Sequence, residues 1–449
     1  MSKKEVKILI IPKIIVTADA KNSILTNQAV EIIDDKISSF IPIKEILKQK
    51  YNEVYDARNL TLIPGFIQTH VHLSQTLFRG LADDLPLLEW LRLKIFPFEN
   101  AHNENSLQIA AQLSINELIM GGTTTFLDMG TLRYCEVVLQ EMINSGIRGF
   151  SGKCLIDMNE LYPEFKSSTD KEIKDIINLA RNFHNLTDER VRYSFSPRFV
   201  LSCSENLLKE SKEIMKDFPG SVYHTHSSES IDEMNEVRKR FRKENIEYFN
   251  SIGVLDDNTI LAHCVHTSDN ERKMMKEQNT RIAHCPSANL KLGSGIAPIP
   301  QFIKEGISVT LGSDGAACNN NLSIFNEMKL ASLIQKSIRG AEVMNAITIF
   351  RMATIEGAKA LHLENEVGSI EVGKKADLVL IDLDSYSNSY SDSDDSVYSD
   401  LVFSSTSENV RSVMVDGRWL VKERQSTIYD QEKIVSKGKE ELNKLLQRL

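Results

Sequence analysis

The chain has 449 residues, 62 acidic and 53 basic side chains and a formal net charge of −9. This charge disfavours a nucleic-acid partner, because binding to a phosphate backbone draws on clustered lysine and arginine, and the sequence contains no such cluster. The apolar runs fall short of the ~20 residues that a membrane-spanning helix needs. With 41% hydrophobic residues, the composition is typical of a globular protein and leaves a small molecule as the expected substrate.

The N-terminal segment reads as β-structure. Its apolar stretch, residues 6–16, imitates a secretory signal only faintly, because Pro12 and Lys13 interrupt it and no convincing cleavage site follows. Residues rich in Ile and Val continue to Phe40 around a turn-like sequence at 19–22. We therefore expect paired strands here and a cytoplasmic protein. The six cysteines form no C-x-x-C pair and are expected to be reduced and mostly buried.

Short apolar runs alternate with stretches of helical periodicity between about residues 60 and 315. Eight strands that alternate with helices predict a parallel sheet with right-handed crossovers, closed into a (β/α)₈ or TIM barrel. We expect this barrel to span residues 61–364. The predicted strands are 61–68, 123–128, 146–156, 191–197, 222–226, 259–263, 281–284 and 307–312.

The two ends of the chain, residues 1–60 and 365–449, have another pattern. Residues 367–384 and 410–421 alternate like strands, with Gly417 as a turn, so the ends are expected to pair in a small β-sandwich. Residues 385–400 are dominated by Ser, Asp and Tyr, which predicts a polar surface loop. The amphipathic helix at 431–449 is expected to cap the sandwich or an oligomer interface, since such barrels often form homo-oligomers.

Chemically capable side chains end nearly every predicted strand. Because barrels of this kind keep their active site at the C-terminal face of the strands, we expect these residues to converge. They are His70 and His72, Asp128, Lys153, Arg198, His226 and Glu229, His263, His284 and Asp314.

Three histidines and one aspartate form a candidate metal site. His70 and His72 are two residues apart and so share one face of a strand, where both imidazoles can hold one cation. His226 ends the fifth predicted strand and Asp314 the eighth. Three imidazoles and a carboxylate suit Zn²⁺, with Fe²⁺ or Mn²⁺ as alternatives, and a position left open for water would make the site catalytic.

The motifs together resemble the amidohydrolase superfamily, in the branch that holds methylthioadenosine/S-adenosylhomocysteine deaminases, guanine deaminases and s-triazine hydrolases. The resemblance covers essentially the whole chain. It implies that His70, His72, His226 and Asp314 bind the metal, that His263 holds the attacking water and that Glu229 shuttles protons. The matching stretches are residues 64–80, 84–91, 121–124, 197–199, 226–229, 261–266, 284–295 and 312–321.

The resemblance also bears on the number of metal ions. Binuclear members bridge two metals with a carboxylated lysine that usually ends the fourth strand, and the fourth predicted strand, 191–197, has no lysine. One divalent metal is therefore expected. Lys153, on the third strand, is either a substrate contact or a structural lysine. His102-Asn103-Glu104 matches half of the motif of another zinc deaminase class, but no P-C-x-x-C follows and we assign it no role.

The substrate is less sharply defined. Residues 289–293 and 312–321 resemble adenosine-type deaminases, and Glu99 falls where such enzymes place a carboxylate for both ribose hydroxyls. Arg198 and Gln75 instead resemble guanine deaminases, in which they address the purine edge. Typical methylthioadenosine deaminases have a histidine at the position of Arg198. An arginine could also donate to ring N3 or N7 of adenine, because it offers only donors.

We therefore expect a hydrolytic deaminase of an aminopurine, with metal-activated hydroxide as the nucleophile and ammonia as a product. An adenine nucleoside, of the 5′-deoxyadenosine, methylthioadenosine, S-adenosylhomocysteine or adenosine type, is the leading substrate. A guanine or other oxopurine is second, and amino- or chlorohydrolysis of an s-triazine third. A non-catalytic relative is disfavoured because the ligand set is complete.

Several of these side chains also have purely structural interpretations. Gln75 and Glu99 could each cap a helix, and Arg198 could pair with a neighbouring carboxylate. His224 is expected to be a hydrogen-bonded residue inside the barrel, and His266 to lie in a loop. His284 could line the pocket and contact substrate.

Overall fold

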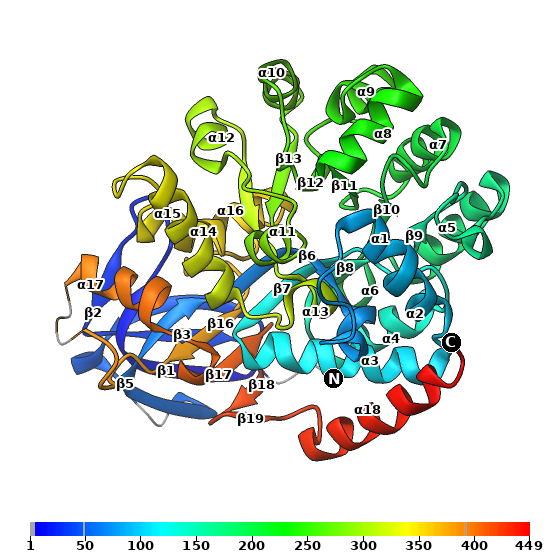
Figure 1. Cartoon of the computed structure of the whole chain (residues 1–449). Coiled ribbons are helices and arrows are strands. Elements are labelled where there is room, and N and C mark those ends of the chain that lie inside the picture. Colours follow the sequence, from blue (N-terminus) through cyan, green and yellow to red (C-terminus); the bar gives the residue numbers. More distant parts are fainter. Residues whose placement is uncertain (1–4, 48–49, 390, 392) are drawn as a thin grey trace. The chain divides into compact units, whose positions relative to one another are not determined.

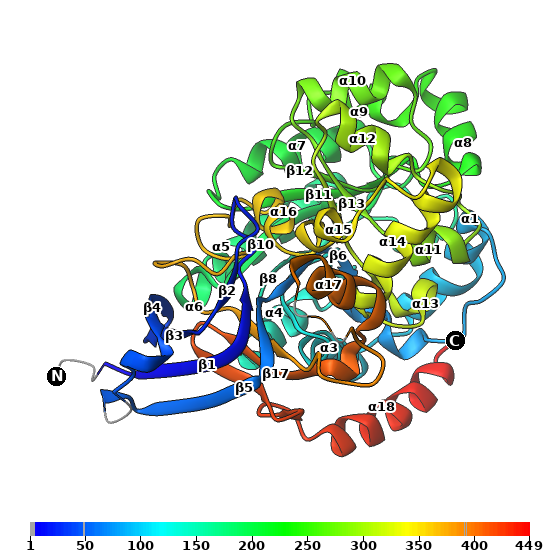
Figure 2. The ribbon, with the colours of Figure 1, turned by 90° about the vertical axis from the view of Figure 1, so that its left-hand side faces the viewer.

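The computed structural model describes residues 5–47, 50–389, 391 and 393–449. Figure 1 and Figure 2 show the chain in two orientations. Within these residues, no helix is both long and apolar enough to cross a membrane. The six cysteines are buried, and none of them forms a disulfide within the described residues. The chain divides into two compact units, which comprise Met1–Ile67, Glu117–Thr125 and Ser323–Tyr429 in the first, and Gln68–Asn116, Phe126–Leu322 and Asp430–Leu449 in the second.

A closed sheet of parallel strands confirms the predicted (β/α)₈ barrel. A short strand, β9 (Cys154–Leu155), prolongs the third strand and pairs with the fourth. The eighth strand is prolonged by β15 (Asp314–Gly315), which pairs with the first and closes the sheet. In sheet order from the first strand, the others are β6 (Phe66–His72), β7 (Thr123–Asp128), β8 (Arg148–Ser151), β10 (Val191–Pro197), β11 (Val222–Ser227), β12 (Thr259–His263), β13 (Arg281–His284) and β14 (Val309–Leu311).

The first barrel strand begins later than predicted. Residues 61–64 belong to β5 (Glu53–Pro64), which lies in the other sheet, and β6 starts at Phe66. Gly65 separates the two strands at a tight approach, because a Cβ there would lie 2.0 Å from the Thr124 hydroxyl. The apolar run continues across this break, so the sequence pattern could not divide it.

Helices pack around the barrel strands (Figure 1). Four of them begin at a serine whose hydroxyl accepts a backbone N–H of the first turn, namely Ser168, Ser204, Ser230 and Ser268. These caps satisfy otherwise unpaired N–H groups and fix where each helix starts after its strand. The helices are α4 (Cys135–Ser145), α5 (Thr169–Phe183), α7 (Glu205–Met215), α8 (Ile231–Phe241), α10 (Asp269–Glu277) and α12 (Ile299–Glu305).

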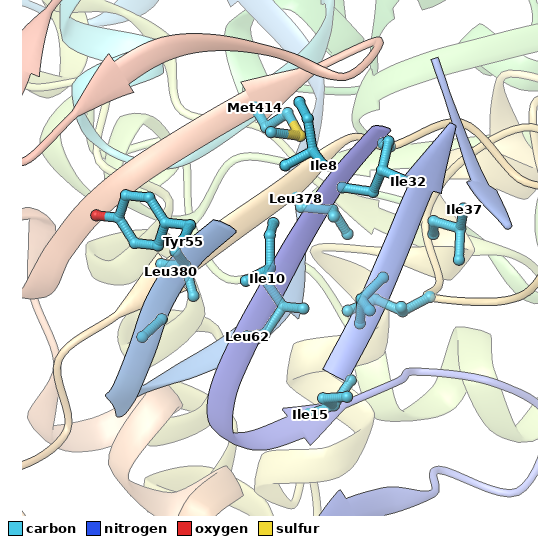
Figure 3. Close-up of a cluster of buried hydrophobic side chains, with 14 of the residues drawn as sticks. Ile8, Ile10, Ile15, Ile32, Ile37, Tyr55, Leu62, Leu378, Leu380 and Met414 are labelled. Atoms are coloured by element: carbon cyan, nitrogen blue, oxygen red, sulfur yellow. The ribbon is translucent and has the colours of Figure 1, made fainter. Parts of the chain in front are cut away.

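The two ends of the chain pair with each other, as predicted, in one mixed sheet that has nine strands among the described residues. From the N-terminal part come β1 (Lys7–Val16), β2 (Ile24–Thr26), β3 (Gln28–Ile33), β4 (Lys36–Pro42) and β5, and from the C-terminal part β16 (Leu378–Ile381), β17 (Val410–Val415), β18 (Arg418–Lys422) and β19 (Gln425–Ser426). Gly417 makes the predicted turn, with a left-handed φ of 70°. Ile10, Leu62 and Leu378 share one core cluster (Figure 3).

The polar segment at 385–400 differs from its prediction. Part of it folds as α17 (Asp394–Ser399), in which Val397 and Tyr398 are buried. The Tyr398 ring packs edge-on against Phe350, with 5.5 Å between ring centroids. The expectation of an unpacked loop was wrong here, because two apolar side chains suffice to bury one face of a short helix. Residues 390 and 392 lie outside the described residues.

The C-terminal helix also differs from its prediction. α18 (Gln431–Leu446) groups with the barrel unit and packs on α3 (Glu104–Met120), whereas the sequence placed it with the sandwich (Figure 1, Figure 2). A Cβ on Gly438 would lie 2.8 Å from Leu113 of α3. Beyond the helix, Arg448 donates from Nε to the Ala101 carbonyl at 2.6 Å. An amphipathic face shows that a helix packs, but not on which surface.

Candidate metal centre and substrate pocket

The four expected metal ligands converge at one end of the barrel. His70 and His72 come from β6, His226 from β11 and Asp314 from β15. Asp314 Oδ1 lies 3.4 Å from the Nε2 atoms of both His70 and His72. His72 Nε2 lies 3.3 Å from His226 Nε2, and the three imidazoles can place ligand atoms within 4.8 Å of one another.

Hydrogen bonds fix the tautomers of two of these histidines. His224 Nδ1 faces the Ile260 carbonyl at 3.0 Å, so this nitrogen carries the proton and His224 Nε2 accepts. His224 Nε2 therefore receives the Nδ1–H of His70, 2.7 Å away. His226 likewise donates from Nδ1 to the Arg198 carbonyl at 2.6 Å. Both histidines are left with an Nε2 lone pair that faces the cluster.

The cluster fits a divalent metal. Burial lowers the pKa values of His70, His72 and His226 well below 6.5, so the imidazoles are neutral, which is the form that binds metals. His70 Nε2 is buried and has no hydrogen-bond partner among the described residues. Three nitrogens and one carboxylate oxygen are a donor set that suits zinc.

His263 and Asp314 face the same space. His263 donates from Nδ1 to the Asn289 side-chain oxygen at 2.8 Å, which leaves its Nε2 lone pair 3.8 Å from Asp314 Oδ2 and 3.4 Å from Glu229 Oε2. Both residues have left-handed backbones, with φ of 75° at His263 and 61° at Asp314. Such backbone strain in non-glycine residues occurs where a side chain must be aimed.

Glu229 is a buried acid next to this cluster. Its backbone N–H donates to Glu233 Oε2 at 2.7 Å, so the capping box of α8 also fixes the loop that carries Glu229. Burial raises the pKa of Glu229 well above 4.5, and the negative charges of Asp314 and Glu233 raise it further. This shift favours the neutral carboxyl group, which is the form that can donate a proton.

A pocket with about 410 Å³ of empty space opens above the cluster. One wall is apolar and comes from α1 (Leu87–Trp90) and the π-helical segment η4 (Leu91–Ile95). The lining also contains polar groups, and this combination of apolar and polar groups suits a flat heterocycle with a few hydrogen-bonding atoms. The lining residues are His72, Gln75, Leu87, Trp90, Leu91, Arg198, Phe199, His226, Glu229, Glu233, His263, Leu292 and Asp314.

Three further predicted site residues form a network beside the pocket. Arg198 donates from Nη1 to Glu99 Oε2 at 2.8 Å and from Nη2 to Glu99 Oε1 at 3.5 Å. Gln75 donates from Nε2 to Glu99 Oε1 at 3.1 Å. The Arg198 guanidinium also lies 4.9 Å from the Phe96 ring centroid. The carboxylate pairing considered for Arg198 is therefore present, and its partner is Glu99.

Two predicted substrate contacts, Lys153 and His284, are not among the residues that line this pocket. Lys153 donates to Glu172 at 2.9 Å and Asp175 at 2.6 Å, and it lines a separate pocket with Arg133. His284 ends β13 and is buried, and burial, followed by the effect of His263, lowers its pKa to about 3. It is absent from the pocket lining given above.

The sequence did not reveal every residue that orients the site. His224 was expected to be hydrogen-bonded, but its partner His70 was not foreseen, although the two-residue spacing from His226 was a usable signal. Asn289 lies in one of the stretches that carry the family resemblance. Its hydrogen bond to His263, which orients the imidazole, could be recognised only in the structure. Glu233 was detectable as the third residue of a capping box after Ser230.

Comparison with known proteins agrees with this geometry. A 5′-deoxyadenosine deaminase from Methanobrevibacter smithii is 38% identical over 89% of this chain and 90% of its own. A 5-methylthioadenosine/S-adenosylhomocysteine deaminase from Thermoanaerobacter pseudethanolicus is 35% identical over 89% and 90% of the two chains. Among solved structures, a zinc-bound adenosine deaminase from Xanthomonas campestris superimposes with a TM-score of 0.90, at 25% identity over 98% and 99%.

The family model of the amidohydrolases matches residues 61–420, which include every residue of the metal cluster and of the pocket. The chain belongs to the amidohydrolase family.

Proposed function

We propose that the chain is a metal-dependent hydrolase that deaminates an adenine nucleoside. The nucleosides considered are 5′-deoxyadenosine, methylthioadenosine, S-adenosylhomocysteine and adenosine, and the names of the relatives favour the first. One observation carries the proposal: a buried acid with a raised pKa, Glu229, lies 3.4 Å from His263 in a pocket that also contains the candidate metal cluster. Deamination of a ring amidine needs a proton donor and a water-activating group in the same pocket.

We propose that His70, His72, His226 and Asp314 hold one divalent ion, with zinc as the preferred metal. The ion, when bound, lowers the pKa of water towards ~7 and so supplies hydroxide at neutral pH. The zinc in the adenosine deaminase relative supports this choice.

The protein's own groups move the protons. His263 Nε2 and Asp314 Oδ2, 3.8 Å apart, can each accept the proton of the attacking water. Glu229 donates its proton to the ring nitrogen next to the reacting carbon. The C–O bond forms, the C–N bond to the exocyclic amine breaks, and the water-derived proton passes through Glu229 to the nitrogen that leaves as ammonia. Without that proton the amine is a poor leaving group.

The remaining pocket groups hold the nucleoside. We propose that the apolar wall with Leu87, Trp90 and Leu91 covers the base. Glu99 accepts the sugar hydroxyls, because its carboxylate offers only acceptors and those hydroxyls are donors. Arg198 holds Glu99 and can donate to a ring nitrogen. Lys153 has no part in this proposal, since two carboxylates engage it.

A second candidate function has one observation in its favour. Gln75 and Arg198 both border the pocket, and together they offer an amide and a cation to a base that carries a carbonyl. This arrangement would suit guanine or another oxopurine.

Ammonia release from the zinc-loaded protein tests both candidates. The panel is adenosine, 5′-deoxyadenosine, methylthioadenosine, S-adenosylhomocysteine, guanine, 8-oxoguanine and melamine, and chelator-treated protein serves as the control. Release from the nucleosides supports the proposal. Release confined to guanine and 8-oxoguanine overturns the nucleoside assignment in favour of the second candidate. Release from melamine alone would favour a triazine hydrolase, and no release from any compound would overturn the deaminase assignment.

A further inference from the structure

Gly315 follows the proposed metal ligand Asp314, and the Gln75 side chain leaves no room for a larger residue at this position. Its backbone is extended, with φ −91° and ψ 150°, a conformation that any residue adopts. A Cβ at this position would lie 2.1 Å from Gln75 Oε1 and 3.0 Å from Gln75 Cδ. The side-chain amide of Gln75 therefore occupies the volume that a side chain at Gly315 would need.

The hydrogen bond of Nε2 determines the orientation of the Gln75 amide. Nε2 donates to Glu99 Oε1 at 3.1 Å, and the reversed amide would place two oxygens against each other. Oε1 points into the space beside Gly315 and is buried without a hydrogen-bond partner within the described residues. A buried acceptor without a partner is unfavourable, so the contact of Nε2 with Glu99 outweighs that cost.

Gln75 and Arg198 together fix the Glu99 carboxylate. Arg198 Nη1 makes the short contact to Oε2, at 2.8 Å, whereas its contact to Oε1 is long, at 3.5 Å. Gln75 Nε2 is the nearer donor to Oε1, at 3.1 Å. Without Gln75 the carboxylate would keep Arg198 as its partner but could rotate about that contact. Gln75 is thus the group that sets the direction in which Glu99 presents its remaining lone pairs.

We propose that Gln75 is a positioning residue for sugar recognition, and that Gly315 supplies the space that Gln75 requires. Gln75 thereby connects the segment that carries the proposed metal ligand Asp314 to the carboxylate that receives the sugar, Glu99. The site should then discriminate in favour of nucleosides with free 2′- and 3′-hydroxyls. This inference rests on the proposed function, in which Glu99 accepts those hydroxyls.

Gly315→Ala is a selective probe of this arrangement. The new methyl group meets chiefly the end of the flexible Gln75 side chain, and it leaves the backbone of Gly315 in an allowed conformation. It also lies 3.3 Å from His72 Cβ, a contact that a shift of a few tenths of an ångström relieves, and the metal content of the variant reports whether this proposed ligand is disturbed. The methyl group should therefore displace the Gln75 amide without moving Asp314. Gln75→Ala removes the amide directly, and the double variant removes the group with which the methyl would collide.

The experiment measures kcat and KM of the zinc-loaded wild type, the two single variants and the double variant. The substrates are 5′-deoxyadenosine and 2′,3′,5′-trideoxyadenosine, which lacks the two hydroxyls. Metal content and the thermal unfolding midpoint of each variant serve as controls. We expect each single variant to raise KM for 5′-deoxyadenosine about tenfold or more, the effect of losing one hydrogen bond to a charged group, at nearly unchanged kcat and metal content. The trideoxy substrate should be affected less than about threefold.

The double variant decides whether Gly315 acts through Gln75. We expect it to resemble Gln75→Ala, because the methyl then meets no amide. If Gly315→Ala is as harmful in the Gln75→Ala background as in the wild type, the coupling is overturned. Equal penalties on both substrates would overturn positioning through Glu99. A wild type that is inactive on both nucleosides would overturn the proposed function as well, whereas an active wild type with no substrate-dependent penalty overturns only the positioning role.

Discussion

The two ends of the pocket satisfy their polar groups in opposite ways. At the metal end, His70, His226 and His263 each use one ring nitrogen in a hydrogen bond to a fixed partner, which leaves the other nitrogen free to bind. At the other end, Glu99, Arg198 and Gln75 already bind one another. A ligand at the metal end completes a set of unpaired atoms, whereas a ligand at the other end must share donors and acceptors that are in use.

This difference separates two kinds of effect. Substitutions at the metal end should change metal binding or turnover, because the ring nitrogens that face the cluster are not used to hold the fold. Substitutions at the Glu99 end should change folding stability and KM, because the same contacts hold the protein and the substrate. Three predictions test this separation, beginning with the largest expected effect.

Glu229→Gln should lower kcat by about 10²–10⁴-fold, because an amide cannot transfer the proton that a general acid supplies. Steady-state kinetics on the active nucleoside measures the loss. Metal content should equal that of the wild type, since Glu229 is outside the ligand set. Glu236→Gln, on the adjacent helix α8 and paired with Arg240 at the surface, is the matched control and should retain full activity. Full activity of Glu229→Gln would remove the residue from the proton path.

Arg198→Leu should destabilise the protein by about 3–5 kcal/mol, because it leaves the Glu99 carboxylate buried without its cation. Denaturant unfolding of the metal-loaded protein measures the change. Arg198→Lys keeps the charge but cannot reproduce both guanidinium contacts, so it should be intermediate in stability and still raise KM. If Arg198→Leu has the same free energy of unfolding as the wild type, the Arg198–Glu99 ion pair contributes nothing to the stability of the fold.

His224→Phe should weaken metal binding by about 10–100-fold, because it removes the acceptor that fixes the tautomer of His70. Competition with a chromogenic chelator measures the affinity. His184→Phe is the control, since His184 contacts the Pro219 carbonyl outside the site and should leave the affinity unchanged. If both variants bind metal like the wild type, the orienting role of His224 is refuted.

Much of the barrel and of the metal cluster could be predicted from the sequence. The barrel strands are short apolar runs with clear ends, and the two-residue spacing of His70 and His72 places both on one face. Because all strands of a parallel barrel end at the same face, residues at strand ends converge whatever their separation along the chain. Regular geometry thus carried that part of the prediction.

The rest depends on contacts between side chains that no periodicity encodes. A carboxylate partner for Arg198 was considered, but the sequence pattern could not identify it as Glu99, because the pairing depends on where α2 (Phe96–Asn100) places Glu99. Lys153 ends a strand like the true cluster residues, yet Glu172 and Asp175 of α5 engage it. The surface on which α18 packs was likewise set by the shape around Gly438, which hydrophobic spacing alone does not report.

The closure of the barrel by β15 against β6 has a consequence for folding. Asp314 arrives with the last strand, whereas His70 and His72 belong to the first, so the complete ligand set exists only once the sheet has joined end to end. Pairing of such distant segments is intrinsically slow, because a long chain loses conformational entropy before the contacts between its ends can stabilise it. A metal that binds only the closed barrel adds stability by mass action, ~4 kcal/mol at a thousandfold excess over its dissociation constant. We therefore expect metal supply, acting through the proposed ligand set, to change how much of the chain completes its fold as well as the rate of the folded enzyme.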